Sequence, residues 1–246
     1  MIYMFKRCIS AEWMKLRHSR VWIMLAVLPL ISVFIGFANF RMNSEVLTKG
    51  WYSLWSQVGL FYGEFFLPVL IAILCAYVWR LEHLNKNWNM IMTAPVPAAC
   101  IFAAKLTVVG FLLFFVQAFL VILYLVSGIL AGLGFLLPVE LSGWILRGWV
   151  ASVAIASIQL LLSMRIRSFA APVGIGLCAV FIGLGMYVAR LGMYFPHSLL
   201  TTGMGVLSQT GLSSGENLLF TAMCLFYMTA CSITAIYLIH RSDVVA

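Results

Sequence analysis

Long apolar segments alternate with short polar connections along the whole chain. A helix needs about 20 apolar residues to cross a bilayer, because each residue advances it by about 1.5 Å through roughly 30 Å of hydrocarbon. Six segments meet this length: Val21–Phe40, Val58–Trp79, Leu106–Leu125, Gly143–Met164, Ala170–Ala189 and Leu218–Ile239. The pattern therefore predicts an all-α membrane protein with about six transmembrane helices, in which residues 1–246 form a single transmembrane domain.

The first 20 residues follow a different pattern. Apolar side chains recur there every three or four positions and so share one face of a helix: Ile2, Phe5, Ile9, Trp13 and Leu16. Basic and other polar residues occupy the rest of the surface. This arrangement is typical of an amphipathic helix that lies in the membrane interface. The alternative is a charged segment that does no more than fix the topology.

The longest polar connection spans residues 80–105. Charged and amide residues open it, an apolar and aromatic stretch follows, and Pro95 and Pro97 end that stretch. Because proline cannot continue a helix and restricts the residue before it, we expect a short helix at Leu84–Met92 and then a rigid turn. The connection 190–217 has room for a re-entrant or interfacial segment.

Composition and charge support a membrane location. Hydrophobic residues make up 64% of the chain and charged residues 9%, whereas soluble domains carry about 25% charged residues. With a cytoplasmic N-terminus, all but four of the 15 lysines and arginines lie on the cytoplasmic side. The four outside are Arg41, Lys49, Arg147 and Arg190. The positive-inside rule therefore predicts that both termini are cytoplasmic, and the net charge of +8 needs no nucleic-acid partner.

Motifs of nucleotide hydrolysis and of metal binding are absent from the sequence. It contains no G-x-x-x-x-G-K-[ST] loop and no H-E-x-x-H pair. The six cysteines form no C-x-x-C pair and do not lie near histidines at metal-ligand spacing. We therefore expect no catalytic residue, no cofactor and no metal. Two G-x-x-x-G motifs, at 59–63 and 128–132, fit either ordinary helix packing or a subunit interface.

Glu64 is the most unusual residue within a predicted span. A charge inside a membrane is costly and often functional. One interpretation is a contact with substrate or with a partner subunit, and the other is a glutamate near the outer interface that reaches water or is protonated. Ion-coupled carriers usually contain several such acids together with internal repeats. Glu64 stands nearly alone, which favours a passive pathway driven by a partner.

The start of the chain resembles a family signature. Residues 11–20, A-E-W-M-K-L-R-H-S-R, are similar to the E-x-x-K-x-[KR]-x-[ST] start of ABC-type exporter permeases of the second type, and Pro29 falls early in the following span. Four residues resemble the E…W…P…K pattern of that family's first cytoplasmic loop: Glu82, Trp88, Pro95 and Lys105. Size and aromatic content resemble the subunits that protect bacteria from lantibiotics and similar peptide antibiotics.

This resemblance implies an ATP-driven exporter in the bacterial cell membrane. Two permease chains, alike or different, would pair with two separate ABC ATPase subunits and expel an amphiphilic peptide. The alternatives are a secondary transporter or channel, or a membrane-embedded enzyme or assembly factor.

The resemblance also assigns residues to two roles. The loop helix becomes a coupling helix that docks on the ATPase, with Trp88 as its apolar anchor and Glu82 as a charged contact. The coupling residues are Glu82, Asn87, Trp88 and Pro95. The N-terminal helix becomes an interfacial elbow, whose signature residues are Glu12, Trp13, Lys15 and Arg17.

Overall fold

The computed structural model describes residues 2–84, 87–93 and 95–241, and every regular element in these ranges is helical. Six helical segments within them are long and apolar enough to cross a membrane. They are Val21–Met42, Trp51–His83, Ala98–Leu130, Leu141–Arg165, Ala170–Val188 and Ser214–His240. The predicted fold class and the predicted number of spans are confirmed.

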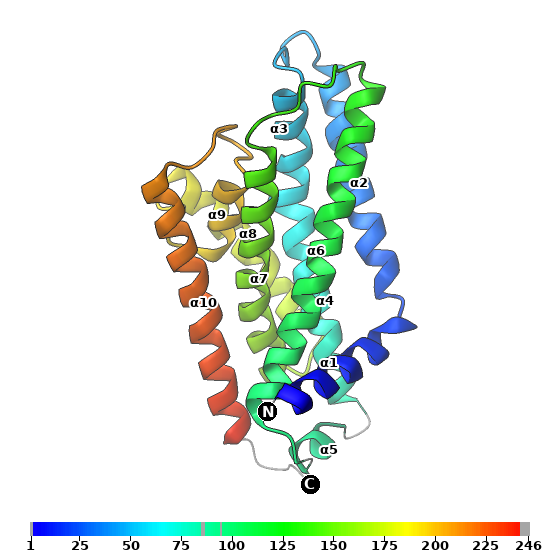
Figure 1. Ribbon diagram of the computed structural model, residues 1–246, viewed down its shortest axis with the longest axis vertical. Coiled ribbons are helices and arrows are strands. Elements are labelled where there is room, and N and C mark those ends of the chain that lie inside the picture. Colours follow the sequence, from blue (N-terminus) through cyan, green and yellow to red (C-terminus); the bar gives the residue numbers. More distant parts are fainter. Residues whose placement is uncertain (1, 85–86, 94, 242–246) are drawn as a thin grey trace.

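The spanning helices lie side by side in a bundle, and α1 crosses one end of it (Figure 1). At the same end, α5 lies beneath the bundle and α10 finishes. The elements are α1 (Ile2–Arg17), α2 (Val21–Met42), α3 (Trp51–Phe61), η1 (Tyr62–Phe66), α4 (Leu67–His83), α5 (Asn87–Thr93), α6 (Ala98–Leu130), α7 (Leu141–Arg165), α8 (Ala170–Val188), α9 (Pro196–Gly203) and α10 (Ser214–His240).

Two spans exceed their predicted lengths by more than two helical turns. The second runs over 33 residues and the third over 33, against the predicted Val58–Trp79 and Leu106–Leu125. At about 1.5 Å per residue each reaches about 50 Å, well beyond the hydrocarbon. The extra turns at the two ends of α6 contact other helices, since Lys105 pairs with Glu12 of α1 and Gly128 packs against Trp51 of α3.

The loop helix is shorter than the predicted Leu84–Met92. Helix α4 continues to His83, and Leu84 then turns to an extended backbone conformation. Helix α5 starts at Asn87 and ends at Thr93. Asn85 and Lys86, which the prediction placed in this helix, lie outside the described residues.

The second span contains a π-helical turn, η1, that we did not predict. The N–H of Leu67 bonds to the carbonyl of Tyr62, five residues earlier. Pro68 explains the change of pattern, because it has no N–H for the carbonyl of Glu64 and its ring would clash with that carbonyl. The added residue of a π-turn relieves this conflict, and such turns are frequent at functional sites. Glu64 therefore lies at an irregular point of the span.

A short helix, α9, occupies the connection between α8 and α10, where the sequence left room for such a segment. It packs against α7, α8 and η1. Pro196 begins it, which suits a residue without an N–H. Arg147 Nε of α7 donates to the carbonyl of Gly203 at 3.0 Å, so a cation stabilises the C-terminal end of α9.

Four buried aromatic side chains form the aromatic cluster at the end opposite α1: Trp51, Trp55, Tyr124 and Trp144. The rings of Trp55 and Trp144 stack with centroids 5.3 Å apart, and Tyr124 meets Trp55 edge-on at 5.2 Å. The indole N–H of each tryptophan and the hydroxyl of Tyr124 donate hydrogen bonds to backbone carbonyls. The acceptors are Gly134 for Trp51 (2.6 Å), Met204 for Trp55 (2.9 Å), Trp51 for Tyr124 (2.8 Å) and Thr210 for Trp144 (3.1 Å).

Three glycines of the two G-x-x-x-G motifs pack within the chain. A β-carbon on Gly59 or Gly63 would meet the side chain of Val206, and one on Gly128 would clash with the ring of Trp51. These three positions therefore fit the interpretation of ordinary helix packing.

Candidate functional site: a buried ion-pair cluster next to the loop helix

Two lysines and two glutamates form a closed ring of ion pairs where α1 crosses the bundle. We call this ring the ion-pair cluster: Glu12, Lys15, Glu82 and Lys105. Lys105 Nζ lies 2.9 Å from Glu12 Oε2 and 2.7 Å from Glu82 Oε1. Lys15 Nζ lies 2.8 Å from Glu12 Oε1 and also pairs with Glu82 Oε1. The ring joins α1, α4 and α6.

Local sequence patterns bring these four charges together. Glu12 and Lys15 are three residues apart on a helix and therefore share a face. The same helix buries Leu16 and packs Trp13 against α6, with its ring centroid 6.4 Å from that of Phe111. Glu82 lies in the last turn of α4. The apolar contacts of α1 thus hold its charged residues over the ends of α4 and α6.

The cluster is deeply buried for a set of four charges. Lys105 is 0% exposed, Glu82 2% and Glu12 7%. Buried charges are stable only when they are paired and hydrogen-bonded, and here each lysine meets both carboxylates. Lys105 Nζ also lies 4.8 Å from the ring centroid of Trp79, a cation–π distance. The cluster has no net charge, so its burial leaves no isolated ion.

Lys15 is the member that reaches solvent, with its side chain 35% exposed. Burial alone would lower its pKa, but attraction and hydrogen bonds from Glu12 and Glu82 outweigh this effect and raise the pKa above its ordinary 10.5. A raised lysine pKa stabilises the folded state fully below the ordinary pKa, and this stabilisation is lost only as the pH rises through the folded-state value. Lys15 is therefore charged at physiological pH.

A stack of rings connects the ion-pair cluster to α5. Trp79, which faces Lys105, lies 5.7 Å from Trp88 of α5 and 6.4 Å from His83, between ring centroids. His83 and Trp88 stack at 5.9 Å. His83 Nε2 lies 3.1 Å from the carbonyl oxygen of Ser163 on α7, to which it must donate. The position of α5 is thereby tied to α4 and α7 as well as to the cluster.

The structure places the predicted coupling residues of the loop in different surroundings. Asn87 Nδ2 donates to the carbonyl of Leu81 at 3.0 Å and fixes the start of α5 to α4. Trp88 is half-buried, with its ring against the bundle, and Pro95 is exposed beyond α5.

Glu82 takes a different place from the one expected. We expected a charged contact for a partner, but its carboxylate is buried between two lysines. In this structure it is therefore not presented to a partner. Met90 of α5 is 70% exposed and presents an apolar side chain outward.

The elbow residues also differ in their surroundings, and some are buried within the protein. Glu12 and Lys15 belong to the ion-pair cluster, Trp13 packs against Trp22 and Phe111, and Arg17 is exposed. Sequence reasoning singled out all four charges of the cluster as members of two separate motifs. It missed that the two motifs meet, because spacing along the chain carries no information about contacts between α1 and α6.

Glu64 is not part of this site. Its 18-residue separation from Glu82 corresponds to about 27 Å of helix. It is 4% exposed, and no ion pair to it occurs within the described residues. It therefore forms a second polar centre, within the other half of the bundle.

The fold defines a class: a six-span helical membrane protein whose charged N-terminal helix is fastened to the base of the bundle. A family model described as ABC-2 family transporter protein matches residues 8–185, well over half of the chain and all of the ion-pair cluster. The chain belongs to this family. It is thus a multi-pass membrane permease subunit of an ABC transporter, which works with ABC ATPase partners. No curated protein matches it significantly.

Proposed function

We propose that this chain is the membrane-spanning subunit of a bacterial exporter that expels an amphiphilic, lantibiotic-like peptide and so protects the cell. Two such chains, alike or different, pair with two ATPase subunits. The end of the bundle that carries α1, α5 and the finish of α10 faces the cytoplasm, as the positive-inside bias supports. The choice of a peptide antibiotic rests on the resemblance in size and aromatic content.

One observation carries the mechanism: α5 is joined through Trp88 to a buried ion-pair cluster that spans three helices. A movement of α5 cannot leave these helices undisturbed, because Trp88 contacts Trp79 and Trp79 contacts Lys105. In the proposed cycle, ATP-driven closure of the ATPases moves α5, and the ring stack passes the movement to the end of α4. Helices α1 and α6 follow because both are ion-paired to Glu82.

This mechanism separates docking on the ATPase from attachment to the bundle, and it moves Trp88 from the expected docking role to attachment. The outward side of α5, with Met90, docks on the ATPase. The side of α5 that faces the bundle is held there by three residues: Glu82, Asn87 and Trp88. Glu82 therefore acts on coupling through Lys105 rather than by touching the ATPase.

The test compares Trp88→Ala with Met90→Ala in the full complex, reconstituted in nanodiscs. Truncation of an aromatic anchor commonly costs about 2 kcal/mol or more. Trp88→Ala should therefore detach α5 from Trp79, remove most transport or peptide resistance, and leave membrane insertion intact. Met90→Ala should weaken ATPase binding, measured by pull-down, without lowering the thermal stability of the permease alone.

Normal transport by Trp88→Ala would contradict the coupling assignment. Trp88→Phe provides the control, since a ring that stacks on Trp79 and His83 should restore much of the activity. For the substrate, expression of the complex should raise resistance to lantibiotics and not to non-amphiphilic antibiotics. Equal resistance to both would exclude the proposed peptide substrate and leave the coupling mechanism standing.

A further inference from the structure

Several buried polar atoms that lack a hydrogen bond of good geometry lie where η1 meets α9. They include Glu64 Oε1, Thr201 Oγ1 and both ring nitrogens of His197. The three residues are 4%, 1% and 7% exposed. Buried polar groups in native proteins are nearly always hydrogen-bonded, so a group of unpaired ones needs an explanation. A bound ligand that supplies the missing hydrogen bonds would be such an explanation.

These groups come together because of two local features. The π-turn before Pro68 carries Glu64, and α9 packs against this turn with Thr201 beside the Glu64 carboxyl group. His197 precedes Thr201 by four residues on the same helix, and residues at this spacing share a face. The junction of η1 and α9 thus brings the carboxyl group of Glu64 next to the hydroxyl of Thr201, and the imidazole of His197 lies one helical turn before this hydroxyl.

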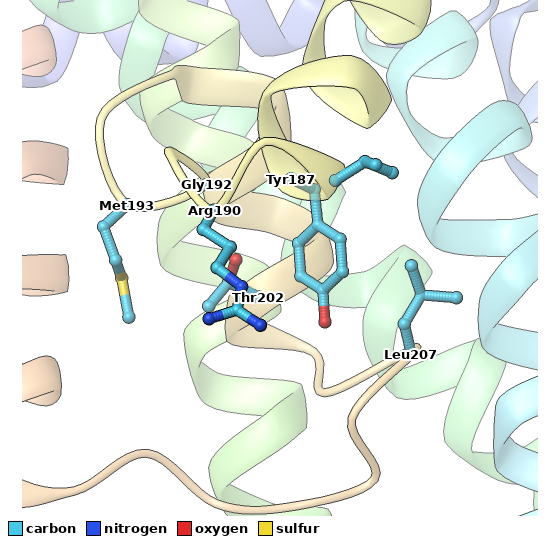
Figure 2. Close-up of a pocket in the computed structure, with 7 residues that line it drawn as sticks. Tyr187, Arg190, Gly192, Met193, Thr202 and Leu207 are labelled. Carbon is cyan, nitrogen blue, oxygen red and sulfur yellow. The ribbon is translucent and has the colours of Figure 1, made fainter.

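An open pocket of about 440 Å³ lies next to α9, which contributes Thr202 to its wall (Figure 2). Tyr187 forms part of its wall and lies close enough to Glu64 to interact with the charge of its carboxylate. Thr202, the neighbour of Thr201, forms another part. The remaining lining residues include apolar side chains that would accommodate an alkyl or peptide chain: Val188, Met193 and Leu207.

The chemistry of the junction favours an ammonium group. An alkylammonium has three N–H donors and no acceptor. Burial lowers the pKa of His197 to about 4, so its ring is neutral and one nitrogen can accept a hydrogen bond. Carboxylate, hydroxyl and imidazole then provide three acceptors. Arg190 also lines the pocket but is exposed, so water and salt screen its positive charge.

We propose that the η1–α9 junction is a binding site for the ammonium group of an amine-bearing amphiphile that enters through this pocket. The proposal names the chemical class of the exported substrate and rests on the proposed function for its biological role. Binding itself needs no ATPase and can be measured on the permease alone, so failure of export and failure of binding are distinguishable.

The experiment uses the full chain in nanodiscs of zwitterionic lipid and the apolar reagent dicyclohexylcarbodiimide. This reagent adds to a protonated carboxyl group in an apolar environment, and mass spectrometry locates the N-acylurea product. We expect an adduct on Glu64 that Glu64→Gln abolishes. Dodecylamine should suppress the adduct at least about fivefold, whereas dodecanol, with the same chain and no charge, should not, since a hydrogen bond to a charged group changes affinity by about tenfold or more.

Thr201 and Thr202 form a matched pair of control positions. The hydroxyl of Thr202 already donates to the carbonyl of Ser198 at 2.8 Å, whereas that of Thr201 faces the Glu64 carboxyl group. Thr201→Val should therefore raise the dodecylamine concentration needed for protection by about tenfold, and Thr202→Val should leave it unchanged. An unreactive Glu64, equal protection by amine and alcohol, or identical behaviour of the two valine variants would each overturn the proposal.

Discussion

The two ends of the bundle are held together by different chemistry. At the end crossed by α1, the ion-pair cluster joins three helices through four charge contacts. At the opposite end, the aromatic cluster joins helices and loops through stacked rings and hydrogen bonds to backbone carbonyls. Both clusters are buried. In the ion-pair cluster a lysine can exchange one carboxylate for the other, whereas the stacked rings of the aromatic cluster require one fixed geometry.

This difference suits the two ends for different roles. The charged end lies next to α5, where the proposed movement enters, and two carboxylates there share two lysines. The partners can therefore shift between equivalent contacts without leaving a charge unpaired. The aromatic end offers no such exchange, because each indole and phenol has one backbone acceptor. We infer that it remains rigid while the charged end rearranges.

The largest expected effect comes from breaking the ion-pair cluster at its centre. Lys105→Met removes the fully buried cation and leaves Glu12 and Glu82 with Lys15 alone. Loss of one partner from a buried ion pair typically costs about 3–5 kcal/mol. Thermal unfolding in detergent, followed by circular dichroism, should show a large loss of stability.

Lys15→Met is the matched control, since this lysine contacts the same two carboxylates but is partly exposed. An exposed ion pair contributes about 0.2–1 kcal/mol, so the loss should be several times smaller. The triple variant Lys105→Met, Glu12→Gln, Glu82→Gln should recover much of the stability lost in Lys105→Met, because it leaves no buried carboxylate in the cluster. If Lys15→Met and Lys105→Met destabilise equally, burial does not govern the strength of the cluster.

An intermediate effect is expected at the aromatic end. Trp55→Phe keeps a ring against Trp144 but leaves the carbonyl of Met204 without its donor, which should cost about 1–3 kcal/mol. The important readout is the separation of stability from coupling. ATPase activity per folded complex should be unchanged, whereas Glu82→Gln should lower it. If Trp55→Phe lowers the ATPase activity as much as Glu82→Gln does, the aromatic end takes part in coupling and does not merely stay rigid.

The smallest effect concerns a half-buried charge near the aromatic cluster. The hydroxyl of Tyr52 donates to Glu140 Oε2 at 2.7 Å, and this hydrogen bond lowers the pKa of Glu140 below its ordinary 4.5. A lowered carboxyl pKa stabilises the folded state above the ordinary value, and the effect disappears as the pH falls through the folded-state value. The small stability difference between wild type and Tyr52→Phe should therefore shrink between pH 7 and pH 3. A constant difference would assign it to packing of the ring.

Much of the fold could be predicted from hydrophobicity because lipid requires about 20 apolar residues in each span. The same rule explains what was missed. It says nothing of helical turns beyond the hydrocarbon, and so the second and third spans were predicted too short. The π-turn had a readable signal in Pro68, whose missing N–H disturbs the carbonyl of Glu64, but hydropathy does not register a change in backbone hydrogen bonding.

The candidate site could be predicted as two motifs but not as one cluster. The residue types in E-x-x-K and E…W…P…K marked Glu12, Lys15, Glu82 and Lys105 as unusual. Their meeting depends on how α1 packs across α6, and that packing joins residues 93 positions apart. The same reason led us to expect Glu82 at the surface, since a glutamate at a helix end is usually exposed unless a distant lysine covers it.

The order of synthesis gives the ion-pair cluster a further consequence. Glu12 and Lys15 leave the ribosome long before Glu82, and Lys105 follows later still. During that interval α1 carries two charges whose long-range partners do not yet exist, and we expect it to remain at the membrane surface while two spans insert. The insertion of α6 then delivers Lys105 and lets α1 dock. A helix at the very start of the chain is therefore among the last parts of this half to reach its final position, and faulty insertion of the third span would leave it undocked and open to quality-control proteases.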